Sequence, residues 1–324
     1  MVTEYVLFIV GILLLVKGAN FLVDGSSSLA KKLKVPTLII GLTIVAFGTS
    51  LPELLVNVFA AINGSTDVAF GNIIGSNIAN ILLVLGITAV ICPIKVRRST
   101  IWKEIPFALL AAVVLFIVSN YLLIDKIKIT TLTRVSGLVM LCFFGIFIYY
   151  AIELSKKNRS ELKDKKLAKE IEKISNLKIF ILIVLGLAGL YFGGNWVVDG
   201  AVFVAQKMGL SQFLISATII AIGTSLPELV TAVTAARRKN VDLAVGNSVG
   251  SNIFNIFWIL GITSLIAPVI IPSFINVDMI FLIFVTFLLF GFMFIGRKDE
   301  FERWQGVFFI VLYIIYIIFI IMRG

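Results

Sequence analysis

The chain has 324 residues and a formal net charge of +10; 60% of its residues are hydrophobic and only 14% are charged. The mean hydropathy is +1.08. A soluble domain of this composition would expose large apolar patches, so the sequence predicts an integral membrane protein. Histidine is absent, which excludes histidine-dependent metalloproteases, Ser-His hydrolases and histidine proton relays. No nucleophile–base pair stands out, so we expect neither an enzyme nor a bound cofactor.

Ten apolar segments, each near the roughly 20 residues needed to cross a bilayer, are predicted to be transmembrane helices. They are continuous rather than alternating in polarity, which favours helices over barrel strands. The predicted spans are 4–24, 36–62, 68–92, 100–121, 129–152, 179–206, 212–236, 242–267, 276–296 and 304–322. Cys92 and Cys142 form no metal or disulfide pattern. No basic residue precedes the first span, so we expect it to stay in the mature protein.

The positive charge is distributed unevenly over the predicted loops. With the N-terminus outside, 22 Lys and Arg residues fall on the cytoplasmic side and five on the other side. The five are Lys126, Lys128, Arg134, Lys207 and Arg323. This asymmetry predicts a multi-pass protein of the cell membrane with both termini extracellular and the central loop cytoplasmic. The expected partner is therefore the lipid bilayer, with no nucleic acid and no obligate protein partner.

The sequence repeats itself after 175 residues. The segment GTSLPE at 48–53 recurs at 223–228, and the pattern GN-x-x-GSNI at 71–78 recurs at 246–253. Arg134 and Gly137 match Arg303 and Gly306 at an offset of 169. Because each half holds an odd number of helices, five, the second half must enter the membrane from the opposite face. We predict an all-α fold of two inverted five-helix repeats, 1–152 and 179–324, joined by a basic cytoplasmic linker, 153–178.

Each copy of GTSLPE places a carboxylate and a proline within a membrane span. Pro52 has no N–H, so the carbonyl of Gly48 loses its helical partner. A broken helix at membrane depth is tolerated only where it is buried in protein or lines a cavity. Thr49 and Ser50 precede Glu53 by four and three residues, so their hydroxyl groups share its face. Gly223, Thr224, Ser225, Pro227 and Glu228 repeat the same arrangement.

The next span of each half carries a polar row with a spacing of four residues. The rows are Asn72, Ser76 and Asn80, and Asn247, Ser251 and Asn255. All these groups offer oxygen, which Ca²⁺ prefers and Na⁺ also seeks, whereas soft metals prefer sulfur or imidazole. The two glutamates together carry the charge that balances one Ca²⁺. Without a cation one of them would tend to take up a proton, so protons stay open as the driving ion.

Structural roles for the same polar residues are also open at this point. The serines could bond back to carbonyls of their own helices. The asparagines Asn80 and Asn255 could join neighbouring helices. For Asp24 and Asp199, each followed by glycine, we favour helix end-capping over ion binding.

With both motifs duplicated, the whole chain resembles the cation/calcium exchanger superfamily and, within it, the prokaryotic sodium/calcium exchanger branch. The resemblance implies Ca²⁺ coordination by Glu53 and Glu228 with the backbone carbonyls of Thr49 and Thr224. It implies Na⁺ sites built from hydroxyl groups and carbonyls, with two asparagines flanking the centre. These residues are Ser50, Ser225, Ser76 and Ser251, carbonyls near Ala46 and Ala221, and Asn80 and Asn255.

At two positions this sequence differs from related families, and both differences bear on which ions are transported. Potassium-dependent relatives place an aspartate where this chain has Asn255, which argues against potassium co-transport. Proton-coupled relatives carry a glutamate after GN in the second motif, where this chain has Ser248. The expected function is a secondary antiporter that exchanges Na⁺ for Ca²⁺ by alternating access to one midplane site. The alternative is a Ca²⁺/H⁺ or other cation/H⁺ antiporter; a cation channel is disfavoured because one chain holds both half-sites.

Overall fold

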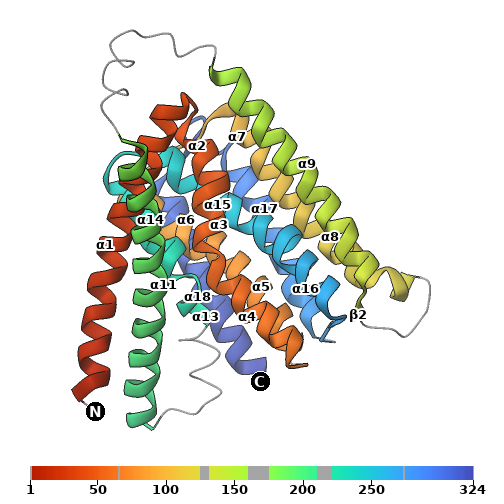
Figure 1. Cartoon of the computed structure of the whole chain (residues 1–324). Helices are drawn as coiled ribbons and strands as arrows, with labels where there is room; N and C mark the ends of the chain where they lie inside the picture. The colour runs from red at the N-terminus through yellow and green to blue at the C-terminus, as the bar shows by residue number, and fades with distance from the viewer. Residues whose placement is uncertain are drawn as a thin grey trace.

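The computed structural model describes residues 2–64, 66–124, 131–159, 175–209, 221–272 and 274–323. Nearly all of these residues are helical, and the helices run roughly side by side (Figure 1). Eight helices in the described ranges are long and apolar enough to cross a membrane, or nine when the bent pair Thr37–Thr49 and Leu51–Ile62 counts as one span. The predicted span 212–236 starts outside the described residues, and its described part is α13 and α14.

The elements of the two halves follow in the same order. The first half contains α1 (Val2–Leu33), α2 (Thr37–Ile40), η1 (Gly41–Val45), α3 (Ala46–Thr49), α4 (Leu51–Ile62), α5 (Thr66–Ala79), η2 (Asn80–Val84), α6 (Leu85–Ile91), β1 (Ile94–Lys95), α7 (Arg98–Trp102), α8 (Glu104–Ile124), β2 (Thr131–Leu132) and α9 (Arg134–Arg159). The second contains α11 (Asn176–Lys207), α13 (Ala221–Gly223), α14 (Leu226–Arg237), α15 (Val241–Ile253), η4 (Phe254–Leu260), α16 (Gly261–Ile266), β3 (Val269–Ile270), α17 (Ile275–Phe292), β4 (Glu300–Phe301) and α18 (Arg303–Arg323). Most of the predicted linker, from 160 to 174, lies outside the described residues.

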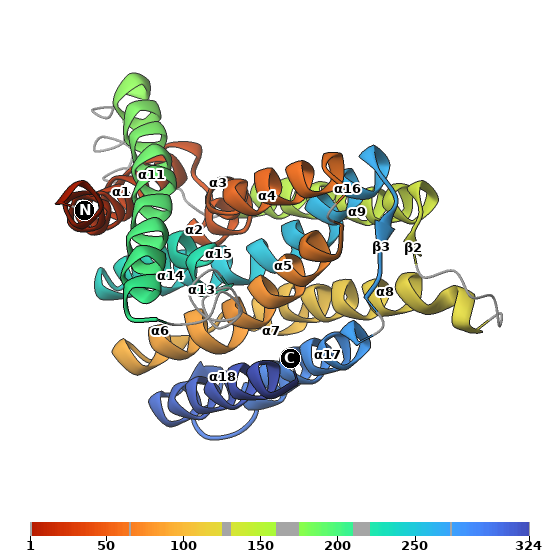
Figure 2. The ribbon, with the colours of Figure 1, turned by 90° about the horizontal axis from the view of Figure 1, so that it is seen from below.

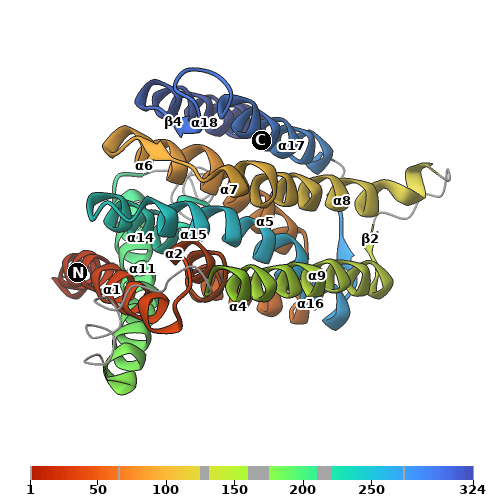
Figure 3. The ribbon, with the colours of Figure 1, turned by 90° about the horizontal axis from the view of Figure 1, so that it is seen from above.

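Two short strand pairs display the inverted symmetry directly. Strand β1 pairs antiparallel with β4, with Ile94 opposite Phe301, and β2 pairs with β3, with Leu132 opposite Val269. Ile94 and Val269 are 175 residues apart, and Leu132 and Phe301 are 169 apart, the two offsets of the sequence repeat. The same register therefore occurs twice, each time between one strand from each half. Figures 2 and 3 show the β2–β3 pair from below and β4 from above.

The first helices of the two halves, α1 and α11, pack against each other along one side of the molecule (Figures 2 and 3). A Cβ added at Gly18 would lie 2.8 Å from the carbonyl oxygen of Gly186, and one at Gly11 would lie 3.0 Å from that of Gly193. Glycine is required at these positions because the two backbones approach so closely. The repeat offset exchanges the two contacts, since Gly11 corresponds to Gly186 and Gly18 to Gly193.

The third spans of both halves form the centre of the main core. Helix α5 and η2 of the first half and α15 and η4 of the second carry large buried apolar side chains such as Phe70, Ile78, Ile253 and Phe257. Helices α8, α17 and α18 pack around them. A second cluster joins α1 to α14. The chain ends lie on one face, and α7 lies at the opposite face (Figure 1).

The predicted end-capping role of Asp24 and Asp199 is wrong, because both residues lie inside helices. Helix α1 continues to Leu33 rather than ending near residue 24, and α11 continues to Lys207. Gly25 is a packing residue, since an added Cβ would lie 2.8 Å from Cγ1 of Ile183 on α11. Helix α1 ends where Lys34 adopts a left-handed φ of 56° and Pro36 follows.

Candidate functional site

Both GTSLPE segments break their helices at the serine. Ser50 has φ −87° and ψ 9°, and Ser225 has φ −89° and ψ 5°, so each lies outside the helical region between two helices. The axes on either side of Ser50 differ by 44°. Pro52 and Pro227 occupy the first turns of α4 and α14, where the missing N–H costs no helical hydrogen bond. The predicted break therefore lies at matching positions in both halves.

The breaks place each glutamate in the first turn of a new helix. Glu53 lies in the first turn of α4 and Glu228 in that of α14, and both helices are 12 residues long. The partial positive charge of a helix N-terminus stabilises a carboxylate there. Both side chains are buried, with exposures of 1% and 0%. Ser50, three residues before Glu53, bonds to the Glu228 carboxylate, so the two motifs meet in one centre. The burial of both carboxylates there creates a strong demand for a cation.

Hydroxyl groups from both halves reach the carboxylate of Glu228. Ser50 Oγ donates to Glu228 Oε1 at 3.2 Å, and Ser251 Oγ donates to the same oxygen at 3.4 Å. The other oxygen, Oε2, has no hydrogen-bond partner although it is buried. Ser50 comes from the first half and Ser251 from the second, so one carboxylate joins the two repeats.

The carboxylate of Glu53 is buried without any hydrogen-bond partner. Both of its oxygens are unpaired, and so is the buried hydroxyl of Ser225, the counterpart of Ser50. The side chain of Asn57 donates from Nδ2 to the backbone carbonyl of Glu53 at 2.7 Å and leaves the carboxylate free. Unsatisfied buried carboxylate oxygens are costly, so this position is suited to a cation that would supply the missing interactions.

The threonines of the two motifs bond to asparagines of the opposite half. Thr49 Oγ1 donates to Asn247 Oδ1 at 3.0 Å, and Thr224 Oγ1 donates to Asn72 Oδ1 at 3.4 Å. Thr224 Oγ1 also lies 3.5 Å from Ser76 Oγ. Asn72 and Asn247 were part of the predicted polar rows but not of the predicted ligand set. Their spacing of four residues from Ser76 and Ser251 was the signal that could have included them.

The two flanking asparagines lie at matching distortions of their helices. Asn80 is the first residue of the π-helix η2, and Asn255 is the second residue of the π-helix η4. Short π-helical segments often occur at functional sites. Both side chains are buried, and neither their amide nitrogens nor their oxygens have a partner in the structure. Neither asparagine therefore joins two helices by a hydrogen bond.

The remaining predicted carbonyls lie beside the breaks. The carbonyl oxygen of Ala46, the first residue of α3, accepts a bond from Ser50 N at 3.0 Å. Ala221 is the first residue of α13. All twelve predicted residues thus lie on the two broken helices and the two polar rows. Hydrogen bonds such as Ser50 to Glu228 connect some of them across the halves. No group of three or more His, Cys, Asp or Glu occurs among the described residues, so two carboxylates dominate the centre.

A cavity of about 470 Å³ leads towards this centre between α4 and α11. Pro52, Val56 and Phe59 line it from α4, and Tyr191 and Asn195 line it from α11. Thr224 lies on its wall, so the cavity reaches one of the predicted ligands. We refer to it as the α4–α11 cavity.

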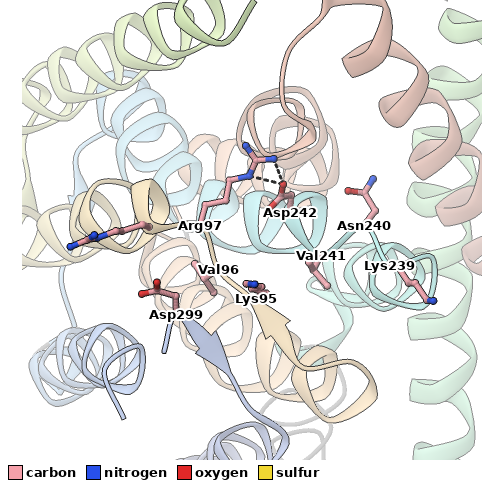
Figure 4. Close-up of a pocket in the computed structure, with 9 residues that line it drawn as sticks. Lys95, Val96, Arg97, Lys239, Asn240, Val241, Asp242 and Asp299 are labelled. Atoms are coloured by element: carbon pink, nitrogen blue, oxygen red, sulfur yellow. Dashed lines mark hydrogen bonds and ion pairs between the residues drawn. The ribbon is translucent and has the colours of Figure 1, made fainter. Parts of the chain in front are cut away.

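A second pocket, of about 450 Å³, lies away from the glutamates and has a basic lining. Figure 4 shows Arg97 directed at Asp242 across it, with an ion pair of 2.6 Å between them. The pair joins the loop before α7 to the first turn of α15. We call the surface lined by Lys95, Arg97, Arg98 and Lys239 the basic face, and we interpret the Arg97–Asp242 pair as a structural contact on it.

Comparison with known proteins identifies the family. A model of the family described as sodium/calcium exchanger protein matches residues 3–153 and 178–322. The chain belongs to the sodium/calcium exchanger family. The exchanger is 29% identical to the sodium/calcium exchanger MaX1 of Methanosarcina acetivorans, with 97% of each chain covered. It is 36% identical to the inner membrane protein YrbG of Escherichia coli, over 81% of this chain and 79% of that protein.

Solved structures confirm the architecture. The sodium-calcium exchanger NCX_Mj, soaked with 10 mM Na⁺ and zero Ca²⁺, matches with a TM-score of 0.81 and 32% identity over 98% of both chains. A form soaked with 10 mM Na⁺ and 10 mM Sr²⁺ gives the same TM-score at 33% identity. The predicted ten-helix fold with two inverted repeats is therefore confirmed. The exchanger is a multi-pass membrane cation antiporter and not an enzyme.

Proposed function

We propose that the exchanger moves several Na⁺ ions in one direction for one Ca²⁺ in the other, through a single midplane site. The observation that carries the proposal is the pair of buried glutamates, three of whose four carboxylate oxygens have no hydrogen-bond partner. One Ca²⁺ balances two carboxylates, and every other group around them offers oxygen. Na⁺ and Ca²⁺ would compete for these oxygens, so the two ions would exclude each other.

The proposed ligands divide between the two ions. Glu53 and Glu228 would hold Ca²⁺ together with the backbone carbonyls of Thr49 and Thr224. The Na⁺ positions would use hydroxyl groups and carbonyls beside the breaks, with the two asparagines flanking the centre. These ligands are Ser50, Ser225, Ser76, Ser251, the carbonyls near Ala46 and Ala221, Asn80 and Asn255.

The proposed orientation places both termini outside the cell and the central linker inside. The 22 basic residues counted above then face the cytoplasm, as the positive-inside rule requires. The α4–α11 cavity is lined by α4 from Pro52 to Phe59, and α4 runs towards the outside in this orientation, so the cavity would open there. Alternating access would then require α1 and α11 to move across the rest of the bundle.

Calcium uptake into sodium-loaded proteoliposomes tests the function. Radioactive Ca²⁺ is added after dilution into sodium-free or sodium-equal buffer at a fixed pH. We expect uptake only with the outward sodium gradient. A positive-inside potential should accelerate it, because more than two Na⁺ would leave for each Ca²⁺. Uptake that ignores sodium but follows an imposed proton gradient would overturn sodium coupling and favour Ca²⁺/H⁺ exchange.

The double variant E53Q/E228Q is the control for the site. It removes both negative charges while preserving side-chain size, so uptake should fall to the level of empty vesicles. Correct folding is checked by size-exclusion chromatography and thermal unfolding. Full transport by this variant would refute the assignment of the two glutamates.

A further inference from the structure

Arg238, at the end of α14, bonds to two side chains on α1. Its guanidinium donates to the Asp24 carboxylate and to the Asn20 amide oxygen. Asn20 is oriented by a further bond from its Nδ2 to the carbonyl of Val16 at 2.7 Å. A single arginine thus connects the first helix of the first half to the broken helix that carries Glu228.

A neighbouring contact extends this connection along the same face of α1. Asn240 Nδ2 donates to Ser27 Oγ at 3.0 Å, and Thr37 Oγ1 donates to Asn240 Oδ1 at 3.0 Å. Asn20, Asp24 and Ser27 are spaced by four and three residues, so they share one helical face. We call the contacts of Arg238 and Asn240 with these three residues the Arg238 latch.

The inverted repeat offers a matched position on the other side of the membrane, and the charged pair of the latch is missing there among the described residues. The counterpart of Asn240, Ser65, lies outside them. Asn195 and Asp199 on α11 correspond to Asn20 and Asp24. The position that matches Arg238 is Asn63, which carries no charge. No cationic side chain pairs with Asp199 in the described part of the chain. Ser27 also has an apolar counterpart, Val202.

Packing differs between the two sides in the same sense. Helix α1 packs along α14, where Ala19 and Leu22 share a buried apolar cluster with Ala232 and Ala235. The equivalent helices α11 and α4 are instead separated by the cavity of about 470 Å³ that reaches Thr224. The latched side is therefore closed and the unlatched side is open.

We propose that the Arg238 latch holds the cytoplasmic side of the exchanger closed and makes the externally open arrangement the resting one. The inference rests on the proposed alternating access of α1 and α11. Because Asn63 replaces Arg238 and Asp199 has no cationic partner among the described residues, the two end states differ in stability although the scaffold is symmetric. Opening to the cytoplasm would separate Arg238 from Asp24 and Asn20. Arg238 is thus a positioning residue and binds no transported ion.

Two matched positions report the state of each side. Val56 lines the α4–α11 cavity, and its counterpart 175 residues later is Thr231, which is fully buried on α14 with an unpaired hydroxyl group. In a background with Cys92→Ser and Cys142→Ser, a single cysteine is introduced as Val56→Cys or Thr231→Cys. A membrane-impermeant maleimide is then added to vesicles of either orientation, in buffer without Na⁺ or Ca²⁺.

Loss of the latch should change the two labelling rates in opposite directions. Asp24 and Arg238 are 53% and 36% exposed, so their pair is partly hydrated. We expect R238Q or D24N to increase the labelling rate at 231 about fivefold and to decrease the rate at 56. A fivefold change is what loss of one partly exposed ion pair can cause. The charge swap D24R/R238D should restore the original rates. The matched variant D199N should alter neither, because Asp199 has no described partner.

Unchanged labelling at both positions in R238Q and D24N would overturn the latch. Faster labelling at both positions would also overturn it, because this outcome indicates general loosening rather than a shift between states. The conservative variant R238K keeps the charge and should give intermediate rates. Labelling is measured without transport, so an exchanger that failed to couple Ca²⁺ to Na⁺ would refute the proposed function while leaving the latch to be judged separately.

Discussion

Two glutamates that occupy matching positions in an inverted repeat have different surroundings. Glu228 accepts hydrogen bonds from Ser50 and Ser251, whereas Glu53 and the nearby hydroxyl of Ser225 have none. The GTSLPE motif and the serines of the polar rows are the same in both halves, so these residues do not cause the difference. It arises because the molecule is in one conformation, in which the two halves cannot be equivalent. We expect the opposite conformation to exchange the two environments.

The helices and strands around the site are symmetric, because the same contacts occur in both halves. The strand pairs have the same register twice, and the glycine contacts between α6 and α18 recur between α9 and α16. A Cβ added at Gly306 would lie 2.6 Å from the carbonyl of Gly86, and one at Gly137 would lie 2.7 Å from that of Gly261. A symmetric frame therefore surrounds an asymmetric centre. This combination allows two states of similar packing.

The largest effect is expected from neutralising either glutamate. E53Q and E228Q each remove half of the negative charge that would balance Ca²⁺ in the proposed mechanism. Loss of one charged partner of a buried cation costs about 3 kcal/mol or more. Each variant should therefore lower Ca²⁺ uptake at least about 100-fold. The measurement is radioactive Ca²⁺ uptake at several Ca²⁺ concentrations, with D199N as an exposed acidic control.

The same pair of variants tests whether the asymmetry matters for function. If the environments exchange during each cycle, both variants should fail equally, because each glutamate passes through both surroundings. A large residual activity in E53Q with none in E228Q would contradict that exchange of environments. It would leave Glu228 as the principal calcium ligand.

Substitution of the serines should have a smaller effect on Ca²⁺ binding, and the effect should differ between the two halves. Ser50→Ala removes a hydrogen bond to a charged group, a loss of about 1.5–3 kcal/mol, whereas Ser225→Ala removes none in this conformation. Ca²⁺ binding to the detergent-solubilised exchanger without Na⁺, measured by calorimetry, should weaken about tenfold more in S50A than in S225A. Sodium dependence of transport should change in both. Equal calcium affinities would show that the hydroxyl bond to Glu228 is not made in solution.

Much of the fold could be predicted because membrane insertion imposes strong rules on the sequence. Apolar length identified the spans, and an odd number of helices per half required the inversion. The predicted end of the first helix near Asp24 was wrong. Aspartate followed by glycine looks like a helix end in sequence, whereas packing of Gly25 against α11 keeps α1 helical to Leu33. The short strands were not predicted, since two-residue pairings depend on the other half and leave no local pattern.

The position of the helix breaks was predictable, whereas the hydrogen bonds between the two motifs were not. Proline and glutamate inside an apolar span indicate a break from one segment alone, and the structure has that break in both halves. The conformation decides which hydroxyl group bonds to which carboxylate. Two identical motifs therefore could not predict that Ser50 bonds to Glu228 while Ser225 has no partner. The bonds from Thr49 to Asn247 and from Thr224 to Asn72 join the halves and have no sequence signal beyond the polar spacing.

The asparagines that accept the two threonine bonds, Asn247 and Asn72, also differ between the halves, and we expect a smaller effect from them. Asn247 accepts from Thr49 at 3.0 Å and donates to the Glu228 carbonyl at 3.4 Å, whereas Asn72 accepts one bond of 3.4 Å and its Nδ2 has no partner. Asn247→Ala should therefore lower the maximal exchange rate about fivefold and Asn72→Ala about twofold, consistent with about 1 kcal/mol for a neutral hydrogen bond. Rates are compared at saturating Ca²⁺ in proteoliposomes. A larger loss in N72A would reverse the contrast between the halves.

The smallest effect is expected at the basic face, where the two sides of the membrane again differ. Arg97 pairs with Asp242 at 2.6 Å, but the position that matches Arg97 on the other side is Pro272. Arg97 is 47% exposed, so R97Q should lower the free energy of unfolding by no more than about 1 kcal/mol. Thermal unfolding of the solubilised exchanger at low salt measures the loss, and high salt should abolish it because ions screen the pair. Transport should stay unchanged, since the pair lies away from both glutamates. A salt-insensitive loss of exchange in R97Q would instead connect this face to the ion site.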